Sequence, residues 1–387
     1  MVEWIRPGIN VDFIGRSRLW IGMSAVIVGI SLLALPANMV LRGSALNYGN
    51  DFKGGSEVQV EFARNVDPAA VRSALTRHGY GNAEVVRLTD SKRPYFYVVR
   101  LGEVSAYSKK QIEQAKKSLA ERFKDQQLKR LDFSEGGDKI YLRFAKPVTS
   151  EALGEGLRAS GLVSQNIEPF GRPEDNTYQV TLVGLDREMR NAFEKAMGAG
   201  VVKDIPQIES VGAKVGAQLR TDGIKSVLYT LILILFYVAL RFNFELAPGA
   251  VVALAHDVII VVGVFAVFYK EFSLQTVAAL LTIGGYSIND TIVTFDRIRE
   301  NATRLRERRL DQMVNTSINE TLSRTLLTSM TVLFTMLAVL YFVRGPVREF
   351  AFAMTIGLVS GTYSTIFIAS PVYLWIHERI ARRAKPT

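Results

Sequence analysis

Asp290 is a carboxyl group placed inside an apolar run of the sequence. It lies in the stretch 284–291, about two helical turns before Arg297. Low dielectric disfavours the charged form of a carboxyl, and ionisable residues inside membrane spans are costly. A buried Asp290 can therefore take up and release a proton, and we interpret it as a functional group. The alternative is a structural polar contact between helices.

Arg324 opens the next apolar run and is separated from Asp290 by one polar loop. Both residues lie in the same half of their runs, so they could meet across a helix pair. A nearby guanidinium favours the charged form of a carboxyl and opposes the effect of burial. A change in their separation would then change the affinity of Asp290 for a proton and could couple a conformational cycle to a proton gradient. The alternative is an interfacial arginine whose charged end reaches water.

His256 and Asp257 lie near the middle of a third apolar run. At that depth they could extend a proton relay, with Asn289 beside Asp290 as a further member. Neighbouring residues on a helix do not face one another, so each could instead bond a different structural partner. Both interpretations stay open. So does the coupling ion, because a sodium site would need more oxygen ligands than Ser287, Asn289 and Thr291 supply from different faces of one helix.

Two further groups are interpreted as structural. The mixed charges of Asp296, Arg297, Arg299 and Glu300 are typical of a solvated or interfacial helix. Small residues recur in the last apolar run and permit close helix packing, so we interpret them as scaffold. They are Ala353, Gly357 and Gly361, with Ser360 and Ser364 on an adjacent stripe.

The elements that must position these side chains are six apolar runs, each long enough to span a membrane, which takes ~20 residues. Only Lys270 and Glu271 separate the third from the fourth. The runs are 19–41, 223–241, 247–269, 272–295, 325–343 and 349–376. The first could instead be a cleaved signal peptide, but its apolar part is too long and Leu35–Ala37 is a poor cleavage site.

Basic residues predict the orientation of the runs. A cytoplasmic N-terminus (1–18) places 14 Lys and Arg in the cytoplasm, among them six arginines of the 296–324 loop, from Arg297 to Arg309, and four residues of the 377–387 tail, and five outside. Arg6 and Lys385 belong to the first set and Arg344 to the second. This orientation predicts that residues 42–222 lie on the outer side of a bacterial inner membrane, that is, in the periplasm.

Composition excludes several classes of function. Residues 43–222 hold 27 Lys and Arg against 24 Asp and Glu, so the net charge of +10 resides mainly beside the apolar runs and predicts no nucleic-acid groove. The absence of cysteine excludes disulfides and thiolate sites. Three scattered histidines predict no metal site, and no nucleotide loop, nucleophile elbow or metalloprotease pair occurs. We therefore expect neither an enzyme nor a cofactor.

The long polar segment contains a repeat with a constant offset of 82 residues, which relates 58–102 to 140–184. Each copy predicts strand, helix, strand, strand. A helix after each copy, at about 108–125 and 186–197, and strands at 131–133 and 207–211 would complete two β-α-β-β-α-β units, at about 48–134 and 139–211. This is the ferredoxin-like pattern; the alternative is two chance α+β segments. The fold class expected is a six-helix membrane protein with an α+β periplasmic domain.

Several motifs resemble the SecD and SecF family of export proteins. One is the glycine motif after the first run, with Gly49, Asp51, Phe52, Gly54 and Gly55. A second, before the second run, contains Val211, Gly212 and Gly216, but Ala213 and Gln218 stand where the family usually has Pro and Glu. Residues 253–263, 285–301 and 319–329 resemble the SecF members in particular.

The resemblance implies a six-helix half of the RND superfamily type that works with SecD. It implies use of the proton motive force to assist preproteins leaving the SecYEG channel, with YajC, YidC and membrane lipid as further partners. Asp290 and Arg324 would lie on the proton pathway. The resemblance leaves two alternatives open: half of an RND-type exporter of small molecules or lipids, and a passive scaffold.

Overall fold

The computed structural model describes residues 10–88, 93–102, 109–134, 139–182, 184–242, 245–343 and 345–384. The chain divides into two compact units, Met1–Gly49 with Thr221–Thr387, and Asn50–Arg220. Three charges used to predict orientation, Arg6, Arg344 and Lys385, lie outside the described residues, as does Val183 at the end of a predicted strand.

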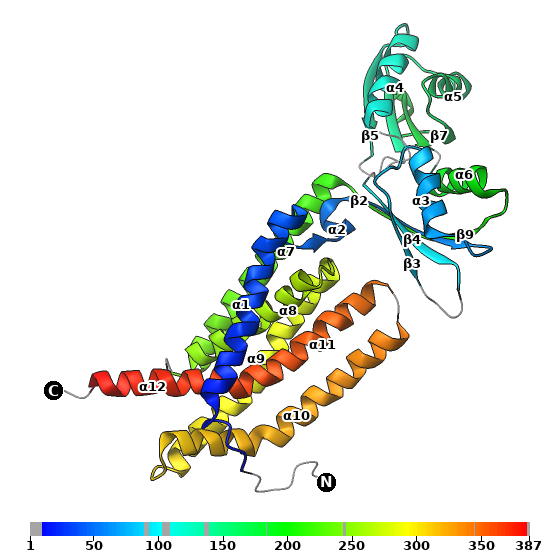
Figure 1. Ribbon diagram of the computed structural model, residues 1–387. Helices are drawn as coiled ribbons and strands as arrows, with labels where there is room; N and C mark the ends of the chain where they lie inside the picture. The colour runs from blue at the N-terminus through cyan, green and yellow to red at the C-terminus, as the bar shows by residue number, and fades with distance from the viewer. Residues whose placement is uncertain are drawn as a thin grey trace. The chain divides into compact units, whose positions relative to one another are not determined.

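The first unit is a bundle of long helices (Figure 1). Its described helices are α1 (Ser17–Arg42), α7 (Ala213–Arg241, whose start belongs to the other unit), α8 (Ala247–Val267), α9 (Leu274–Arg304), α10 (Leu310–Phe342), α11 (Pro346–Ser364) and α12 (Ser370–Ala384). A π-helical segment, Thr365–Ala369, joins α11 to α12. Two short strands, β1 (Asn47–Tyr48) and β10 (Glu271–Phe272), pair in parallel.

Five stretches of the described chain are long and apolar enough to cross a membrane: α1, α7, α8, α10 and Pro346–Ile380. The predicted run 272–295 corresponds to α9, which does not meet the same measure. Its buried residues include polar ones such as Ser287, Asp290 and Thr294, which lower its hydropathy. These side chains are buried because α9 packs against α8, α10 and α11.

The predicted loop 296–324 is largely helical. The helix α9 continues to Arg304, and α10 begins at Leu310, well before the predicted start of its span at 325. Polar residues on these extensions therefore occupy fixed positions on neighbouring helices rather than on a loop.

The second unit contains two four-stranded sheets. The first has the order β3-β4-β2-β9, with β2 (Gly55–Phe62), β3 (Glu84–Leu88), β4 (Phe96–Leu101) and β9 (Val202–Val211). The short helix α2 (Asn50–Lys53) precedes β2 and contacts β2 and β9. The second has the order β5-β6-β8-β7, with β5 (Leu128–Phe133), β6 (Lys139–Phe144), β7 (Ser164–Pro169) and β8 (Thr177–Leu182). All neighbouring strands in both sheets are antiparallel.

Each sheet packs two helices over its own core. Helices α3 (Pro68–Arg77) and α6 (Leu185–Met197) lie together at the first sheet, and α4 (Lys109–Arg122) and α5 (Ser150–Ala159) at the second (Figure 1). Phe62, Tyr97 and Phe193 pack edge to face in the first core. The second core is separate and contains Leu142 and Leu157.

The predicted unit bounds, about 48–134 and 139–211, do not coincide with the two sheets. The helix α6 and strand β9, expected to complete the second unit, complete the first, where β9 pairs with β2. The helix α4 and strand β5, expected to complete the first unit, complete the second, where β5 pairs with β6. The closing elements are thus exchanged, because two repeats of the same pattern offer equivalent edges and the sequence does not say which edge each strand joins.

Candidate functional site

Asp257 on α8 is the centre of a buried polar cluster. Its side chain is fully buried, and three hydroxyl groups donate hydrogen bonds to it. Ser287 Oγ on α9 lies 2.6 Å from Oδ2, Ser360 Oγ on α11 lies 2.6 Å from Oδ1, and Ser364 Oγ lies 2.8 Å from Oδ2. The Nδ1 atom of His256 lies 3.1 Å from Oδ1. One carboxyl group therefore joins α8, α9 and α11.

Close helix packing brings these serines to Asp257. A side chain at Gly361 would meet Ser287 Cβ at 3.1 Å, and one at Gly357 would meet Ile283 at 2.2 Å. The stripe of small residues does permit close packing, as expected, but the interpretation of Ser360 and Ser364 as scaffold alone is incomplete. Both contact a buried carboxyl, and two hydroxyls four residues apart in an apolar helix are the signal in the sequence that could have indicated this.

Asp290 on α9 is also buried, with 4% of its surface exposed, but it has fewer donors. Within the described part of the chain, it accepts one side-chain hydrogen bond, from Ser329 Oγ on α10 at 3.1 Å. Arg324, also on α10, is close enough to interact electrostatically with Asp290, although the described residues form no ion pair between them. Arg324 itself is exposed.

The two carboxyls are linked through one face of α9. Ser287, Asp290, Thr291 and Thr294 are spaced for one helical face, and all four are buried. Thr291 Oγ1 lies 3.0 Å from Thr365 Oγ1 in the π-helical segment. Ser287 and Thr291 therefore share a face, whereas Asn289 is exposed on another side of α9, so the three side chains do not lie on one face, as expected.

His256 has one buried nitrogen without a partner. Its Nδ1 faces Asp257, and its ring stacks on Tyr363 with centroids 6.1 Å apart. Its Nε2 atom is one of two buried side-chain polar atoms that lack a hydrogen bond among the described residues. Adjacent residues on a helix thus interact here, which the sequence analysis did not expect.

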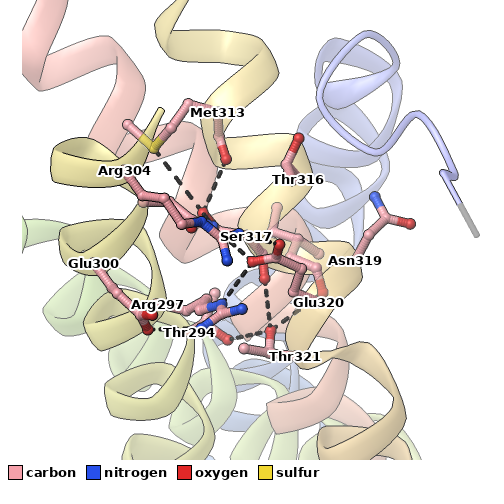
Figure 2. A network of polar contacts seen from close by, with 12 residues as sticks. Thr294, Arg297, Glu300, Arg304, Met313, Thr316, Ser317, Asn319, Glu320 and Thr321 are labelled. Atoms are coloured by element: carbon pink, nitrogen blue, oxygen red, sulfur yellow. Dashed lines mark hydrogen bonds and ion pairs between the residues drawn. The ribbon is translucent and has the colours of Figure 1, made fainter. Parts of the chain in front are cut away.

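The end of α9 and the start of α10 are joined by an ion-pair network around Glu320 (Figure 2). Arg297 Nε lies 2.6 Å from Glu320 Oε2, and Arg304 Nη2 lies 2.5 Å from Oε1. Asn301 Nδ2 donates to Glu320 at 2.7 Å and to Ser317 Oγ at 2.9 Å. Partial burial raises the pKa of Glu320, but hydrogen bonds from Asn301, Arg297 and Arg304 outweigh burial and leave that pKa below its usual range.

The charges at 296–300 are therefore more than a solvated helix edge. Asp296 accepts two hydrogen bonds from Arg241 Nη2, at 2.9 and 2.7 Å, which joins α7 to α9. Arg297 bridges Glu320 and Glu300. Arg299 lies 3.8 Å from Asp296. Glu320 was not predicted, because an isolated Glu in a polar stretch carries no distinguishing pattern.

The glycine motifs are sites of close backbone approach in the second unit. Gly54 and Gly55 have φ values of +75° and +126°, which favour glycine. A side chain at Gly54 would meet Ala213 Cα at 2.7 Å, and one at Gly216 would meet Gly54 N at 2.9 Å. The two motifs thus contact each other. Phe52 is buried, Asp51, Val211 and Gly212 are partly exposed, and Gly49 belongs to the first unit, where its N–H donates to Phe272 O.

Comparison with known proteins gives two family matches. Residues 192–379 match the family described as protein export membrane protein SecD/SecF, C-terminal, and residues 44–66 match the SecD/SecF GG motif. Protein translocase subunit SecF of Cereibacter sphaeroides is 31% identical over 370 residues, which cover 95% of this chain and 90% of that protein. SecF of Thermodesulfovibrio yellowstonii is 39% identical over 249 residues, which cover 63% and 82%.

A solved structure is similar over nearly the whole chain. The crystal structure of SecDF from Thermus thermophilus matches with a TM-score of 0.65 and 28% identity over 96% of this chain. This chain spans only 39% of that longer protein.

A bundle of apolar helices with buried carboxyls, together with an α+β unit that carries two glycine motifs, defines a membrane protein of the SecD/SecF type. The chain belongs to the SecF family, whose members are auxiliary subunits of the Sec protein translocase rather than known catalytic enzymes.

Proposed function

We propose that this chain uses the proton motive force, and that Asp290 is the carboxyl that binds and releases the proton. The observation that carries this proposal is the contrast between two buried carboxyls. Among the described residues, Asp257 has four hydrogen-bonding neighbours, whereas Asp290 has one, Ser329. Hydrogen bonds to a carboxylate favour its charged form, so the group with few donors is the better candidate for a change in protonation.

Arg324 is the charge partner of Asp290 in this proposal. Its guanidinium interacts with Asp290 without a fixed ion pair in the described chain, so the strength of the interaction can change as α10 moves against α9. A closer arginine favours the carboxylate and releases a proton, and a more distant one favours uptake. This is the coupling that the sequence analysis predicted for the two residues.

Asp257 and His256 form a fixed hub beside this carboxyl. Three hydroxyls and one imidazole hold Asp257 between α8, α9 and α11, which favours the structural interpretation of the pair over a relay. The bond from Ser287 to Asp257 holds α9 against α8 and α11. In this proposal α9 therefore stays fixed while α10 moves relative to Asp290. Asn289 is exposed on another side of α9, so its proposed place is at the surface that a partner protein would cover.

We propose SecD as the partner that covers the exposed polar face of α9 and α10. Asn289, Arg324 and Thr328 are exposed on this face. Polar and charged side chains that face lipid are costly, so a protein partner is the favourable neighbour of this face. The similarity to SecDF, which is described as a translocon-associated membrane protein, supports this choice of partner.

The same proposal extends to the setting of the chain. In this proposal, the chain lies in the bacterial inner membrane with six spans, namely the five apolar stretches and α9. Both termini lie in the cytoplasm, and residues 42–222 lie in the periplasm. The two sheets of the second unit are each ferredoxin-like, since their strand orders and paired helices fit that pattern. The SecYEG channel, YajC, YidC, the translocating preprotein and lipid are the other partners.

The test is export by the reconstituted chain. Proteoliposomes containing this chain, SecD and SecYEG would complete preprotein translocation faster when a proton gradient is imposed than after an uncoupler is added. Proteoliposomes with SecYEG alone are the control. A gradient-dependent gain that does not require this chain would contradict the proposal. Gradient-driven efflux of a small molecule without a preprotein would favour the exporter alternative.

A further inference from the structure

The described chain begins with an irregular segment, residues 10–15, that lies against the start of α10. Two asparagines one turn apart on α10 contact it. Asn319 Oδ1 accepts a hydrogen bond from Val11 N at 2.9 Å, and Asn319 Nδ2 donates to Val11 O at 2.9 Å. Both polar backbone atoms of Val11 are thus bound by one carboxamide group. Figure 2 shows Asn319 on α10 beside the blue N-terminal ribbon.

Asn315 extends the same contact. Its Oδ1 accepts hydrogen bonds from Phe13 N at 2.9 Å and Ile14 N at 3.3 Å. Its Nδ2 donates to Val11 O at 2.9 Å and to Asn10 Oδ1 at 3.3 Å. Because most of these bonds go to backbone atoms, the contact depends on the two asparagines and hardly on the side chains of the segment.

The segment connects helices that otherwise pack elsewhere. It leads directly into α1, which packs mainly against α8, whereas α10 packs against α9 and α11. Phe13 also packs edge to face on Phe367 of the π-helical segment, with ring centroids 5.7 Å apart. The N-terminal segment therefore fixes the start of α10 to the part of the bundle that contains the Asp257 hub.

The opposite side of the same α10 turns is fixed to α9. Glu320 binds Arg297 and Arg304, and Ser317 binds Asn301. The start of α10 is thus held from both sides, by backbone contacts to residues 10–15 and by ion pairs to α9. Further along the same helix lie Ser329, which donates a hydrogen bond to Asp290, and Arg324, whose charge interacts with Asp290.

We propose that Asn315 and Asn319 are positioning residues that make the cytoplasmic start of α10 a fixed pivot. Asn319 and Arg324 are separated by about 7.5 Å along the helix axis, at ~1.5 Å per residue. With its start held, α10 responds to a change in the charge of Asp290 by tilting, and its outer end moves while its start does not. The distance of Arg324 from Asp290 is then set by the tilt of one rigid helix. This inference rests on the proposed function of Asp290.

The test measures movement at both ends of α10. The chain has no native cysteine, so pairs of spin labels can be introduced for pulsed electron–electron distance measurements on the full chain in nanodiscs. The inner pair is Leu19→Cys with Gln312→Cys, and the outer pair is Leu41→Cys with Phe342→Cys; all four positions are exposed. Asp290→Asn serves as the neutral form of the carboxyl.

The expected result is a shift of the outer distance distribution on Asp290→Asn, with the inner distribution unchanged. In the Asn315→Leu, Asn319→Leu background the inner distribution shifts as well. Asn319→Ala serves as a milder variant if the double variant does not fold. The matched control is Val11→Ala, which should behave as the parent chain because the amide of Asn319 binds the Val11 backbone and the Val11 side chain is 44% exposed.

Two results would overturn the pivot. One is an inner distance that shifts on Asp290→Asn while both asparagines are present. The other is an inner distance that does not shift on Asp290→Asn when both asparagines are replaced. If the outer distance also stays fixed in every background, α10 does not respond to Asp290. That result contradicts both the proposed coupling and the pivot, which depends on it. A gradient-dependent export gain measured on the same unlabelled variants shows separately whether the proposed function stands.

Discussion

Asp257 and Asp290 lie on neighbouring helices, and their hydrogen-bond partners differ in number. Each hydrogen bond to a charged acceptor contributes about 1.5–3 kcal/mol, and losing a buried partner leaves the other groups unsatisfied. Three serine hydroxyls around Asp257 would lose their charged acceptor if it were replaced. In the part of the chain that the structure describes, one hydroxyl, that of Ser329, donates to Asp290. The same substitution should therefore have different consequences at the two sites.

We predict that Asp257→Asn lowers the free energy of unfolding by about 2–5 kcal/mol, because a buried network loses its central acceptor. Asp290→Asn should change it by less than half as much. Unfolding of both variants in mixed micelles provides the measurement, with Ser360→Ala as a control that removes a single donor. Equal destabilisation by the two Asp→Asn changes would contradict the assignment of Asp257 as the structural hub.

Glu320 should make stability depend on acidic pH. Its pKa in the folded chain lies below the ordinary value of 4.5, so the ion-pair network stabilises the protein fully above pH 4.5 and less as pH falls through the folded pKa. Glu320→Gln should therefore lower the melting temperature at pH 7, and the difference from the parent chain should shrink below pH 4.5. Glu307→Gln is a suitable control, because Glu307 is exposed and is not among the residues that bind Glu320 in the described chain. A difference that grows on acidification would contradict this account.

The sequence predicted the burial of the candidate functional residues better than it predicted their partners. Asp290, His256 and Asp257 were expected to be buried from their places in apolar runs, and they are. The hydroxyl donors of Asp257 could not be assigned, because they come from two other helices and depend on which faces meet. Hydrophobicity predicts that a helix is inserted but not how it is rotated against its neighbours.

At the scale of elements, small residues decide how closely α1 and α8 approach. A side chain at Gly263 on α8 would meet Ser31 Cβ at 2.1 Å and Ser31 Cα at 2.8 Å. The backbones of the two helices are therefore too close for any residue larger than glycine. The sequence offers several glycines in both helices, and only the packing tells which of them this contact requires.

Gly263→Ala should separate α1 from α8 and lower the melting temperature. Gly29→Ala on α1 is the matched control, because nothing lies within 4 Å of the added carbon, and alanine is the better helix former. We expect the control to be neutral or slightly stabilising. Thermal unfolding of the two variants in nanodiscs would decide the matter, and a similar loss in both would mean that the Ser31 contact does not limit helix packing.

The run 272–295 was predicted to be a span because it is apolar and long enough, although α9 as a whole does not meet the measure that the other five stretches meet. The difference has a physical cause. A helix that packs on three neighbours meets little lipid, so polar side chains can be buried between helices at low cost. The polar face that carries Asp290 is also what makes α9 the least apolar of the predicted spans.

At the scale of the whole molecule, the repeat predicted two similar sheets but assigned their last elements wrongly. An offset of 82 residues identifies equivalent strands, and β2, β3 and β4 match β6, β7 and β8. It cannot identify which of two equivalent edges a strand joins, because both edges offer the same backbone donors and acceptors. The second sheet, with its two helices, is therefore an insertion between β4 and α6.

This arrangement predicts that the second sheet can be removed from the full chain. Deleting 103–183 and joining Gly102 to Gly184 through a short Gly-Ser linker should leave the pairing of β2 with β9 intact. Deleting 139–211, the bounds of the second repeat, should destroy it, because β9 is lost. Hydrogen exchange at β2 in the two variants is the measurement. Loss of protection in both would contradict the exchanged arrangement.

The central claim, that Asp290 couples a proton gradient to export, is tested most directly by its own substitution. The chain carrying Asp290→Asn would be reconstituted with SecD and SecYEG, and preprotein translocation would be followed with ATP, with and without an imposed proton gradient. We predict normal translocation driven by ATP and loss of the gradient-dependent gain. A variant that gains from the gradient as much as the parent chain would contradict the claim and place the coupling elsewhere.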